Sequence, residues 1–550
     1  MVMPTMNFNI DDFNKLAGKK FKDKELDEKI PLFGAVVEKT EGREMEIEVF
    51  PDRPDLLSVE GLARAFSGFM GVKKGYVGYP SVSSGVKVIV DKSVNKIRPH
   101  IACAVLKDVK LTDEMVKSLM QLQEKLHASH CRKRKKASIG VYDLDSIKFP
   151  VTYKAEGKNL KFVPLEFKEQ LTLEDILKKH PKGKDYAWIL EGKEKYPVLV
   201  DAKGMVLSMP PIINSEDSKV KKDSKGLFID VTGMDKKTVN EALNIVVCAL
   251  ADRGADIKTV NVVYSDKNVK TPQLGAWEQD VKISYINKIL GLELSGKDVC
   301  KLLEKMRFFA AEISKGNIRV KVPPYRTDIM HPIDIAEDVA IAYGYNNFKP
   351  EIPSVATIGD EREAAIFSRK IRDLMIGLGF SEALTFILTN KDDLFLKMGL
   401  KEEKIAEASN PRTVDYYGCR NWLLPSLMKA LTVNKHNLFP QKLFEVGECV
   451  VFDKTDTGTR TVLKLAGVAS YEKCNLTEIK SIVESILKNL GLEYEIKSFE
   501  HPSFIDNRCG EIIVNGGRIG FFGEINPFVL SKWNLEMPII GMEIDLEKLL

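Results

Sequence analysis

The sequence predicts a multidomain protein of the α+β class, and three observations lead to this class. The chain has 550 residues, which is too long for one hydrophobic core and indicates about three to five domains. Hydrophobic residues make up 44% of the chain and charged residues 29%, as is typical of soluble globular proteins. Short strand patterns and helical patterns follow one another along the chain, so both kinds of secondary structure are expected.

The first expected domain covers residues 1–85. It contains a helical pattern in IDDFNKLAG and an alternating strand pattern in EMEIEVF. After these comes PDRPDLLSVEGLARAFSGFMG, in which Asp52, Pro54 and Asp55 indicate a turn. The segment after the turn includes Gly61 and predicts a closely packed helix.

The second expected domain, residues 86–269, alternates short strands with helices. Strand patterns occur in VKVIV, HIACAVLKDV, PVLVDAKG and GLFIDVTG. Helices are expected over residues 111–130 and 236–252.

A polar loop interrupts this second domain from Pro210 to Lys219, with the sequence PPIINSEDSK. Asn214 and Ser215 stand next to two isoleucines in it. Hydrogen-bonding groups beside apolar side chains are typical of a small pocket that reads a polar group on an apolar ligand. A plain turn explains the same residues equally well.

Two further domains are expected. Residues 270–349 contain a strand (DVKISY), a helix (SGKDVCKLLEKM), a strand (NIRVKVP) and an acidic helix. The Pro-bearing link FKPEIPSVA leads into residues 350–550, where helices and longer strands are expected.

The acidic helix carries the most specific pattern in the chain. Asp334, Glu337 and Asp338 stand at i, i+3 and i+4, on one face of a helix that begins near Pro332, and Asp328 lies just upstream. Four carboxylates are the ligands that a hard cation such as Mg²⁺ or Ca²⁺ prefers. Acids also complement the dipole of a helix N-terminus, and this alternative stays open.

The charge balance restricts nucleic-acid binding to local surfaces. The chain has 82 basic and 78 acidic residues and a net charge of +4, so its surface as a whole is not a polycation. The five consecutive cations RKRKK, Arg132 to Lys136, are a candidate contact to a phosphate backbone. A solvated run of charges is the simpler interpretation.

Other features bear on location and chemistry. Eight cysteines are scattered without CxxC spacing, so neither a zinc ribbon nor a disulfide framework is expected, and a reducing cytoplasm is favoured. The sequence shows no secretory signal pattern and no apolar run long enough to span a membrane. It also contains no Walker motif, no GxGxxG after a strand and no HExxH.

Six segments together resemble the beta subunits of phenylalanine–tRNA ligase in their archaeal and eukaryotic form. In chain order they are PDRPDLLSVEGLAR, LHASHCRKRKKASIGVYDLDSIKFPVTY, PPIINSEDSK, PYRTDIMHPIDIAEDVAIAYGY, SNPRTVDYYGCRNWLLPSLMKAL and KLFEVGECV. The resemblance implies an N-terminal B1-like domain (1–85), a B3/B4-type editing domain (86–269), a winged-helix-like B5 domain (270–349) and a degenerate class II synthetase-like domain with an antiparallel sheet (350–550).

The resemblance also implies partners and chemistry. The enzyme would be a cytoplasmic (αβ)₂ tetramer that uses ATP, bound mainly by the α subunit, to attach phenylalanine to tRNA-Phe. The family's magnesium site, described as shared with the α subunit, matches Asp328, Asp334, Glu337 and Asp338 here. The editing domain would hydrolyse tyrosine wrongly attached to tRNA-Phe, with Asn214, Ser215 and the FIDVTG strand as the expected pocket region. Individual editing catalysts cannot be matched.

The last domain departs from true class II enzymes. Those enzymes need an arginine in motif 2 and another that ends Gly-x-Gly-x-Glu-Arg, because both neutralise triphosphate charge. Here the motif-2-like strand reads Phe444-Glu445-Val446-Gly447, and no Gly-x-Gly-x-Glu-Arg occurs. We therefore expect this domain to pack against the α subunit without forming adenylate, with Arg420 and Pro425 in a packing helix and the segment leading into it.

Two alternatives remain open at this point. One is a free-standing, magnesium-dependent hydrolase that uses the four carboxylates of the acidic helix. The other is a non-catalytic RNA-binding scaffold that works through RKRKK.

Overall fold

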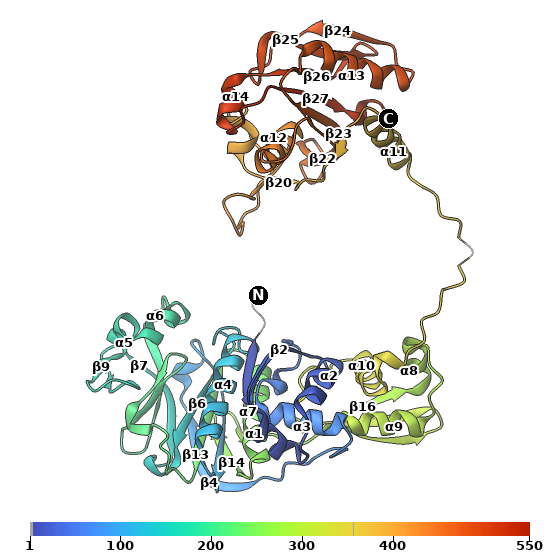
Figure 1. Ribbon diagram of the computed structural model, residues 1–550. Coiled ribbons are helices and arrows are strands. Elements are labelled where there is room, and N and C mark those ends of the chain that lie inside the picture. The colour runs from blue at the N-terminus through green and yellow to red at the C-terminus, as the bar shows by residue number, and fades with distance from the viewer. Residues whose placement is uncertain (1–3, 356) are drawn as a thin grey trace. The chain divides into compact units, whose positions relative to one another are not determined.

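The computed structural model describes residues 4–355 and 357–550 (Figure 1). The chain divides into two compact units, Met1–Ile352 and Pro353–Leu550. Helices and strands are mixed in both units, so the expected α+β class is confirmed. No helix in the described residues is long and apolar enough to cross a membrane.

The first unit begins with a three-stranded antiparallel sheet in the order β1-β3-β2. Its strands are β1 (Thr5–Asn9), β2 (Ala35–Glu41) and β3 (Glu44–Val49), and its helices are α1 (Ile10–Ala17), α2 (Asp23–Phe33) and α3 (Val59–Phe69). Asn9 caps α1 by accepting from the backbone N–H groups of Asp11 and Asp12. Nearly all of α3 is buried, and a Cβ on Gly61 would lie 1.8 Å from the carbonyl oxygen of Asp55. Only glycine allows this close approach.

A large sheet follows in the order β12-β11-β10-β7-β4-β14-β5-β13-β6, with β15 paired to β14. Its pairs are antiparallel except β14–β4 and β4–β7. The strands are β4 (Val82–Val90), β5 (His100–Lys107), β6 (Ala137–Asp143), β7 (Val151–Gly157), β10 (Lys195–Val200), β11 (Val206–Met209), β12 (Ile213–Asn214), β13 (Leu227–Gly233), β14 (Asp256–Val263) and β15 (Asn268–Thr271).

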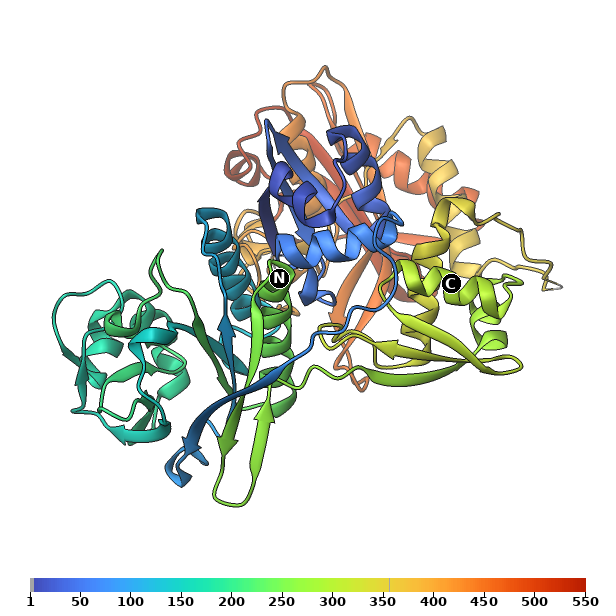
Figure 2. The ribbon, with the colours of Figure 1, turned by 90° about the horizontal axis from the view of Figure 1, so that it is seen from below.

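Two helices, α4 (Asp113–Ala128) and α7 (Lys236–Asp252), pack on one face of this sheet. The other face has a core of its own, which includes Cys103, Tyr142 and Phe228. A small subdomain built from β8 (Lys161–Phe162), β9 (Leu171–Thr172), α5 (Leu173–Lys179) and α6 (Pro181–Tyr186) lies at the end of the unit away from α9 (Gly296–Lys305), as Figures 1 and 2 both show.

The first unit ends in a three-stranded antiparallel sheet with three helices. The sheet has the order β16-β18-β17, with β16 (Trp277–Lys282), β17 (Phe309–Ser314) and β18 (Asn317–Val322). The helix α10 (Pro332–Tyr343) packs against α8 (Ile283–Leu290) and α9. Its buried residues, among them Ile335 and Val339, join the core that runs through this unit.

The second unit is built on a seven-stranded sheet in the order β19-β22-β23-β27-β26-β25-β24, antiparallel except at β19–β22. The strands are β19 (Ser381–Glu382), β22 (Gln441–Phe452), β23 (Thr459–Ser470), β24 (Tyr494–Ser498), β25 (Phe504–Val514), β26 (Gly517–Ile525) and β27 (Ile539–Asp545). This is the antiparallel sheet expected from the sequence.

Helices cover both faces of this second sheet. The helices α11 (Glu363–Gly377) and α13 (Leu476–Asn489) contribute to one core, and α12 (Leu424–Asn434) and α14 (Pro527–Lys532) to the other. A two-stranded ribbon, β20 (Leu388–Thr389) with β21 (Gly418–Cys419), completes the unit.

Candidate functional site

The acidic helix α10 begins with a capping box. The side chain of its N-cap residue His331 accepts from the N–H of Ile333 at 3.2 Å. Asp334 Oδ2 in turn accepts from the backbone N–H groups of Met330 and His331, both at 2.7 Å. One oxygen of Asp334 is therefore occupied by the start of the helix.

Arg326 forms ion pairs with two of the other acids, Asp328 and Asp338. Its Nη2 lies 2.6 Å from Asp328 Oδ2 and 2.6 Å from Asp338 Oδ2, and its Nε donates to Asp328 Oδ1 at 2.9 Å. Arg326 and Asp338 are both buried. Burial raises the pKa of Asp338 against the opposing effect of Arg326. Burial acts in the same direction on Asp328, but the guanidinium of Arg326 outweighs it and holds the pKa of Asp328 below its usual value.

Negative charge exceeds positive charge around Glu337. Burial and the nearby carboxylates of Asp52, Asp334 and Asp328 raise its pKa. Asp52 comes from the N-terminal turn, where the buried pair Arg53–Asp55 also lies, with a contact of 2.8 Å. The sequence pattern indicated only a turn at Asp52, because its proximity to α10 depends on tertiary structure.

The four acids have different neighbours in the structure. Asp328 and Asp338 converge on Arg326, Asp334 caps the helix, and Glu337 faces the region of excess negative charge. Among residues 4–355 and 357–550, no three carboxylate, imidazole or thiol side chains form a group that could hold a metal ion. The oxygen donors and the charge excess fit a hard cation, and the metal assignment stays a prediction.

The large sheet of the first unit encloses a polar trio. The hydroxyl of Tyr142 on β6 donates to Asp230 Oδ1 on β13 at 2.5 Å and lies 2.8 Å from Ser208 Oγ on β11. All three side chains are buried. Burial raises the pKa of Asp230 to about 7, although the Tyr142 hydrogen bond and the charge of Arg98 oppose the rise.

The trio lies where the two ends of the sheet meet. β6 is at one end of the strand order and β11 and β12 are at the other, so the contact between Tyr142 and Ser208 requires the sheet to curl. Asn214 reinforces this seam because its Nδ2 donates to the Val141 carbonyl at 3.3 Å. A Cβ on Gly140 would lie 2.2 Å from the Tyr142 hydroxyl and 2.4 Å from Asp230 Oδ1, so the trio depends on glycine at this position.

The two expected pocket residues lie at different places. Asn214 is paired in register with Ser208 and therefore borders the trio. Ser215 is fully buried, donates to the Val163 carbonyl and caps a short 3₁₀ helix at Asp217. The strand that carries Asp230 was expected in the pocket region, whereas Tyr142 and Ser208 were not. They come from distant segments that only the curled sheet brings together.

In the second unit, Glu445 on the motif-2-like strand is paired with Arg420, which follows β21. Arg420 Nη2 lies 2.8 Å from Glu445 Oε1, and both residues are buried. Arg420 also donates to Thr385 Oγ1 at 2.6 Å and to the Glu448 carbonyl at 2.9 Å. Glu543 accepts from the first N–H groups of α12 and from Lys464. These contacts leave Arg420 engaged inside the unit.

Family models match three parts of the chain. Residues 98–262 match the B3/4 domain, residues 279–345 the tRNA synthetase B5 domain, and residues 349–546 the phenylalanyl tRNA synthetase beta chain CLM domain. With the antiparallel sheet of the second unit, these matches define a subunit of an aminoacyl-tRNA synthetase.

Known relatives identify the family. The chain is 43% identical to the phenylalanine–tRNA ligase beta subunit of Archaeoglobus fulgidus, over 99% of this chain and 98% of that protein. It is 42% identical to that of Pyrococcus horikoshii, over the whole of both chains. A crystal structure of an N-terminal fragment of the Pyrococcus horikoshii beta subunit matches with a TM-score of 0.60 and 41% identity, covering 62% of this chain and 99% of that one. The chain therefore belongs to the family of phenylalanine–tRNA ligase beta subunits and is a subunit of that ligase, as its motifs indicated.

Proposed function

We propose that this chain joins an α subunit in an (αβ)₂ enzyme that charges tRNA-Phe, and that its residues 86–269 hydrolyse tyrosine wrongly attached to this tRNA. The observation that carries the editing proposal is the buried trio of Tyr142, Ser208 and Asp230. A site shaped for phenylalanine rejects tyrosine poorly because tyrosine only adds a hydroxyl. A second site built around hydrogen-bonding groups can read that hydroxyl directly.

The protonation state of Asp230 suits this task. With a pKa of about 7, its carboxyl can donate to or accept from a phenolic hydroxyl near neutral pH. Tyrosine in the same place would add a hydrogen bond to the trio, worth about 0.5–1.5 kcal/mol, which phenylalanine cannot make. The trio would therefore favour tyrosyl over phenylalanyl esters.

The synthetic reaction is assigned to the α subunit, which would bind ATP and phenylalanine. Two features support this division. The sequence contains neither of the class II arginines that neutralise triphosphate charge, and Arg420 is held by Glu445 inside its own unit. The second unit would then serve as a packing partner. The enzyme would work in the cytoplasm, in keeping with the eight free thiols of the chain.

We also propose that the acids of α10 bind Mg²⁺ at the junction with the α subunit. Asp328, Asp334, Glu337 and Asp338 would supply the oxygen ligands, and the ion would offset the excess negative charge around Glu337. Because Arg326 already holds Asp328 and Asp338, the ion needs further ligands from water or the α subunit. A free-standing metal-dependent hydrolase is less well supported, since the chain belongs to a family of ligase beta subunits, which implies an α partner.

The test uses the purified enzyme. Native mass measurement should find a second chain in equal amount, and phenylalanine-dependent exchange of pyrophosphate into ATP should require it. Hydrolysis of Tyr-tRNA-Phe by the complete enzyme should fall at least tenfold in Ser208→Ala while Phe-tRNA-Phe synthesis persists. Exchange by the isolated chain, or full hydrolysis by Ser208→Ala, would contradict the proposal.

A further inference from the structure

The cationic turn RKRKK after α4 has an inner and an outer side. Arg134 is buried, whereas Arg132, Lys133 and Lys135 are exposed. The four residues therefore differ in role although they are adjacent in the sequence.

The backbone of this turn is left-handed over three consecutive residues. The φ angles are 47° at Arg132, 50° at Lys133 and 64° at Arg134. Each such residue costs about 1–2 kcal/mol, so the surroundings must fix the turn. Backbone hydrogen bonds hold its two ends, from Cys131 N to the Leu126 carbonyl at 2.8 Å and from Lys136 N to the Cys131 carbonyl at 3.0 Å.

The inward side chain of Arg134 ties the turn to the loop beside the trio. Its Nη1 donates to the carbonyls of Pro211 and Ile212 at 3.2 and 2.9 Å. Its Nη2 donates to Glu124 at 3.0 Å, and its guanidinium lies over the ring of Tyr186 at 4.4 Å. The turn is thereby fixed to the segment that leads into Asn214.

Arg98 provides a second link, from the turn to the strand that carries Asp230. Its Nη2 donates to the Arg134 carbonyl at 3.2 Å and to the Thr232 carbonyl at 2.7 Å. Thr232 lies two residues after Asp230 on β13. A shift of the cationic turn would therefore change the position of the strand that carries Asp230, through these direct hydrogen bonds.

No ion pair or helix-capping contact in the described residues accounts for the three outward cations, Arg132, Lys133 and Lys135. Within residues 4–355 and 357–550, no ion pair involves Arg132, Lys133 or Lys135. The helix C-terminus does not need them either, because the last carbonyls of α4 accept from the backbone of Ser129, Cys131 and Arg134. Glu124, an acid on α4, is already engaged by His127, Arg134 and Lys182. Three exposed cations without an ion pair therefore stand on a turn that backbone hydrogen bonds hold at both ends.

We propose that Arg132, Lys133 and Lys135 bind the phosphates of the single-stranded acceptor end of an RNA as it enters the region of the trio, and that Arg134 is a positioning residue for this turn. The proposal rests on the editing function proposed above. Charge complementarity gives the occupant, because the phosphates of the tRNA that the editing function would handle match three exposed cations.

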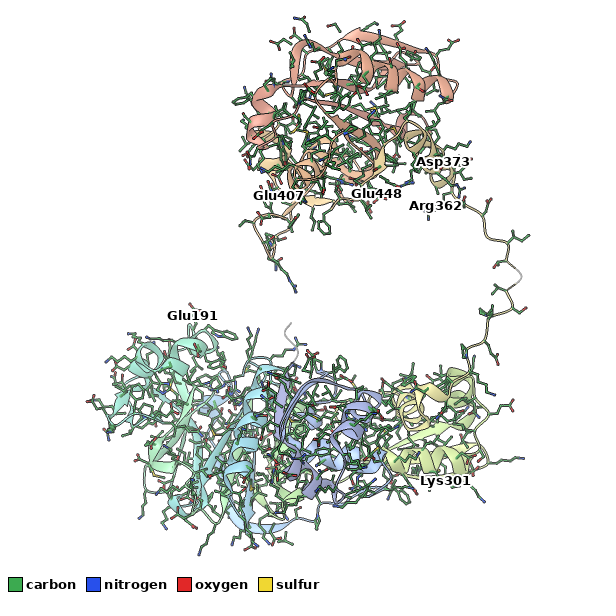
Figure 3. The ribbon with its side chains drawn as sticks, in the orientation of Figure 1. Glu191, Lys301, Arg362, Asp373, Glu407 and Glu448 are labelled. Atoms are coloured by element: carbon green, nitrogen blue, oxygen red, sulfur yellow. The ribbon has the colours of Figure 1, made fainter. Side chains whose placement is uncertain are left out.

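The main test is a triple variant, Arg132→Gln, Lys133→Gln and Lys135→Gln, in the complete α/β enzyme. The matched control replaces three exposed lysines of α8 and α9, Lys288, Lys297 and Lys301, by glutamine. Figure 3 shows Lys301 at the end of the first unit opposite Glu191, which follows the α6 subdomain. We expect the KM for Tyr-tRNA-Phe hydrolysis to rise about tenfold in the triple variant, with kcat changed less than about twofold.

Salt dependence gives a more specific readout. Each phosphate contact to a single strand contributes a slope of about −0.7 in log K against log salt concentration. The slope of the triple variant should therefore be less negative than that of the wild type by about 2, and the control variant should keep the wild-type slope. A KM and a slope equal to those of the control would overturn the proposal.

A binding assay separates this proposal from the editing function. The probe is a single-stranded oligoribonucleotide with the acceptor-end sequence of tRNA-Phe, bound to the complete enzyme without any hydrolysis. If the wild-type enzyme does not hydrolyse Tyr-tRNA-Phe but the triple variant binds the probe more weakly than the control, the editing function fails and the RNA site stands. Equal binding by the two variants would reject the RNA site.

The positioning role of Arg134 predicts a different kinetic change. Arg134→Met should lower kcat for Tyr-tRNA-Phe about tenfold with KM nearly unchanged, because the loop carbonyls of Pro211 and Ile212 lose their donor. Arg134→Lys keeps a cation that can reach one of these carbonyls and should recover part of kcat. A rise in KM without a change in kcat would contradict this role.

Discussion

The guanidinium of Arg326 donates to the carboxylate of Asp338 at 2.6 Å, and both side chains are buried. The same guanidinium also holds Asp328, so two carboxylates of the proposed cation site share one positive charge. The N-terminal turn lies close enough to α10 for Asp52 to raise the pKa of Glu337. The acids of α10 are therefore part of a charge network that the domains of the first unit form together.

Removing the guanidinium of Arg326 from this network should destabilise the first unit strongly. Arg326→Met leaves the buried Asp338 and the half-buried Asp328 without their partner, and we expect a loss of about 3–5 kcal/mol in the free energy of unfolding. Asp338→Asn keeps a hydrogen-bond acceptor and should cost much less. Urea unfolding of the two variants measures the difference, and an Arg326→Met midpoint equal to that of Asp338→Asn would contradict it.

The sequence predicted those parts of the molecule that local patterns determine. The class and the helix that begins at Pro332 follow from periodicity and capping residues, and the antiparallel sheet of the second unit was implied by the family resemblance. The partners of the acids could not be predicted in this way. Asp334 stays a predicted metal ligand, and its additional capping contacts depend on where the backbone of Met330 turns. Tyr142 and Ser208 meet because the sheet curls, and no spacing in the sequence encodes that contact.

The charge excess around Glu337 predicts opposite effects of one substitution with and without Mg²⁺. Without the ion, Glu337→Gln should raise the melting temperature, because it removes repulsion from Asp52 and Asp334. With the ion, Glu337→Gln should remove a ligand, so the stabilisation by Mg²⁺ seen in the wild-type enzyme should shrink.

Thermal unfolding of the complete enzyme, with and without Mg²⁺, measures both effects. Glu293→Gln, an exposed site after α8, is the control. Equal stabilisation by Mg²⁺ in the wild type and in Glu337→Gln would remove Glu337 from the proposed ligands.

The raised pKa of Asp230 predicts a pH dependence of stability. Between pH 3.8, the ordinary value, and about 7, the unfolded carboxyl has lost its proton while the folded one keeps it. The folded state is therefore favoured at low pH, and this advantage is lost as pH rises towards 7. Asp230→Asn carries no titratable carboxyl at this position, so its stability does not fall with pH for this reason.

The measurement is the difference in unfolding free energy between Asp230→Asn and the wild type at pH 5 and pH 8. We expect this difference to move in favour of the variant by about 2–3 kcal/mol over that interval. Titrations elsewhere in the chain are common to both proteins and cancel. A difference that is constant with pH would show that Asp230 ionises normally.

The close approach at Gly140 allows a test of the trio that leaves its polar groups in place. In Gly140→Ala the new methyl group would lie 2.2 Å from the Tyr142 hydroxyl and 2.4 Å from Asp230 Oδ1, so the two side chains must separate. Hydrolysis of Tyr-tRNA-Phe should fall at least tenfold, with Phe-tRNA-Phe synthesis retained. Gly157→Ala, where the methyl group meets nothing within 4 Å, is the control, and equal hydrolysis by the two variants would separate the trio from editing.

The buried pair Arg420–Glu445 predicts strongly non-additive effects in the second unit. Arg420→Met should cost about 3–5 kcal/mol because it leaves Glu445 charged in a site with almost no solvent contact. Glu445→Leu should cost a similar amount by orphaning Arg420 and Thr385.

The double variant Arg420→Met with Glu445→Leu removes both charges, and apolar side chains of similar size replace them. Its cost should be smaller than the sum of the single costs by at least about 2 kcal/mol. Denaturant unfolding of all four proteins in the double-mutant cycle measures this coupling. If the costs add, Arg420 is not held mainly by Glu445. It would then be available for contacts outside its unit, against the packing role proposed for this part of the chain.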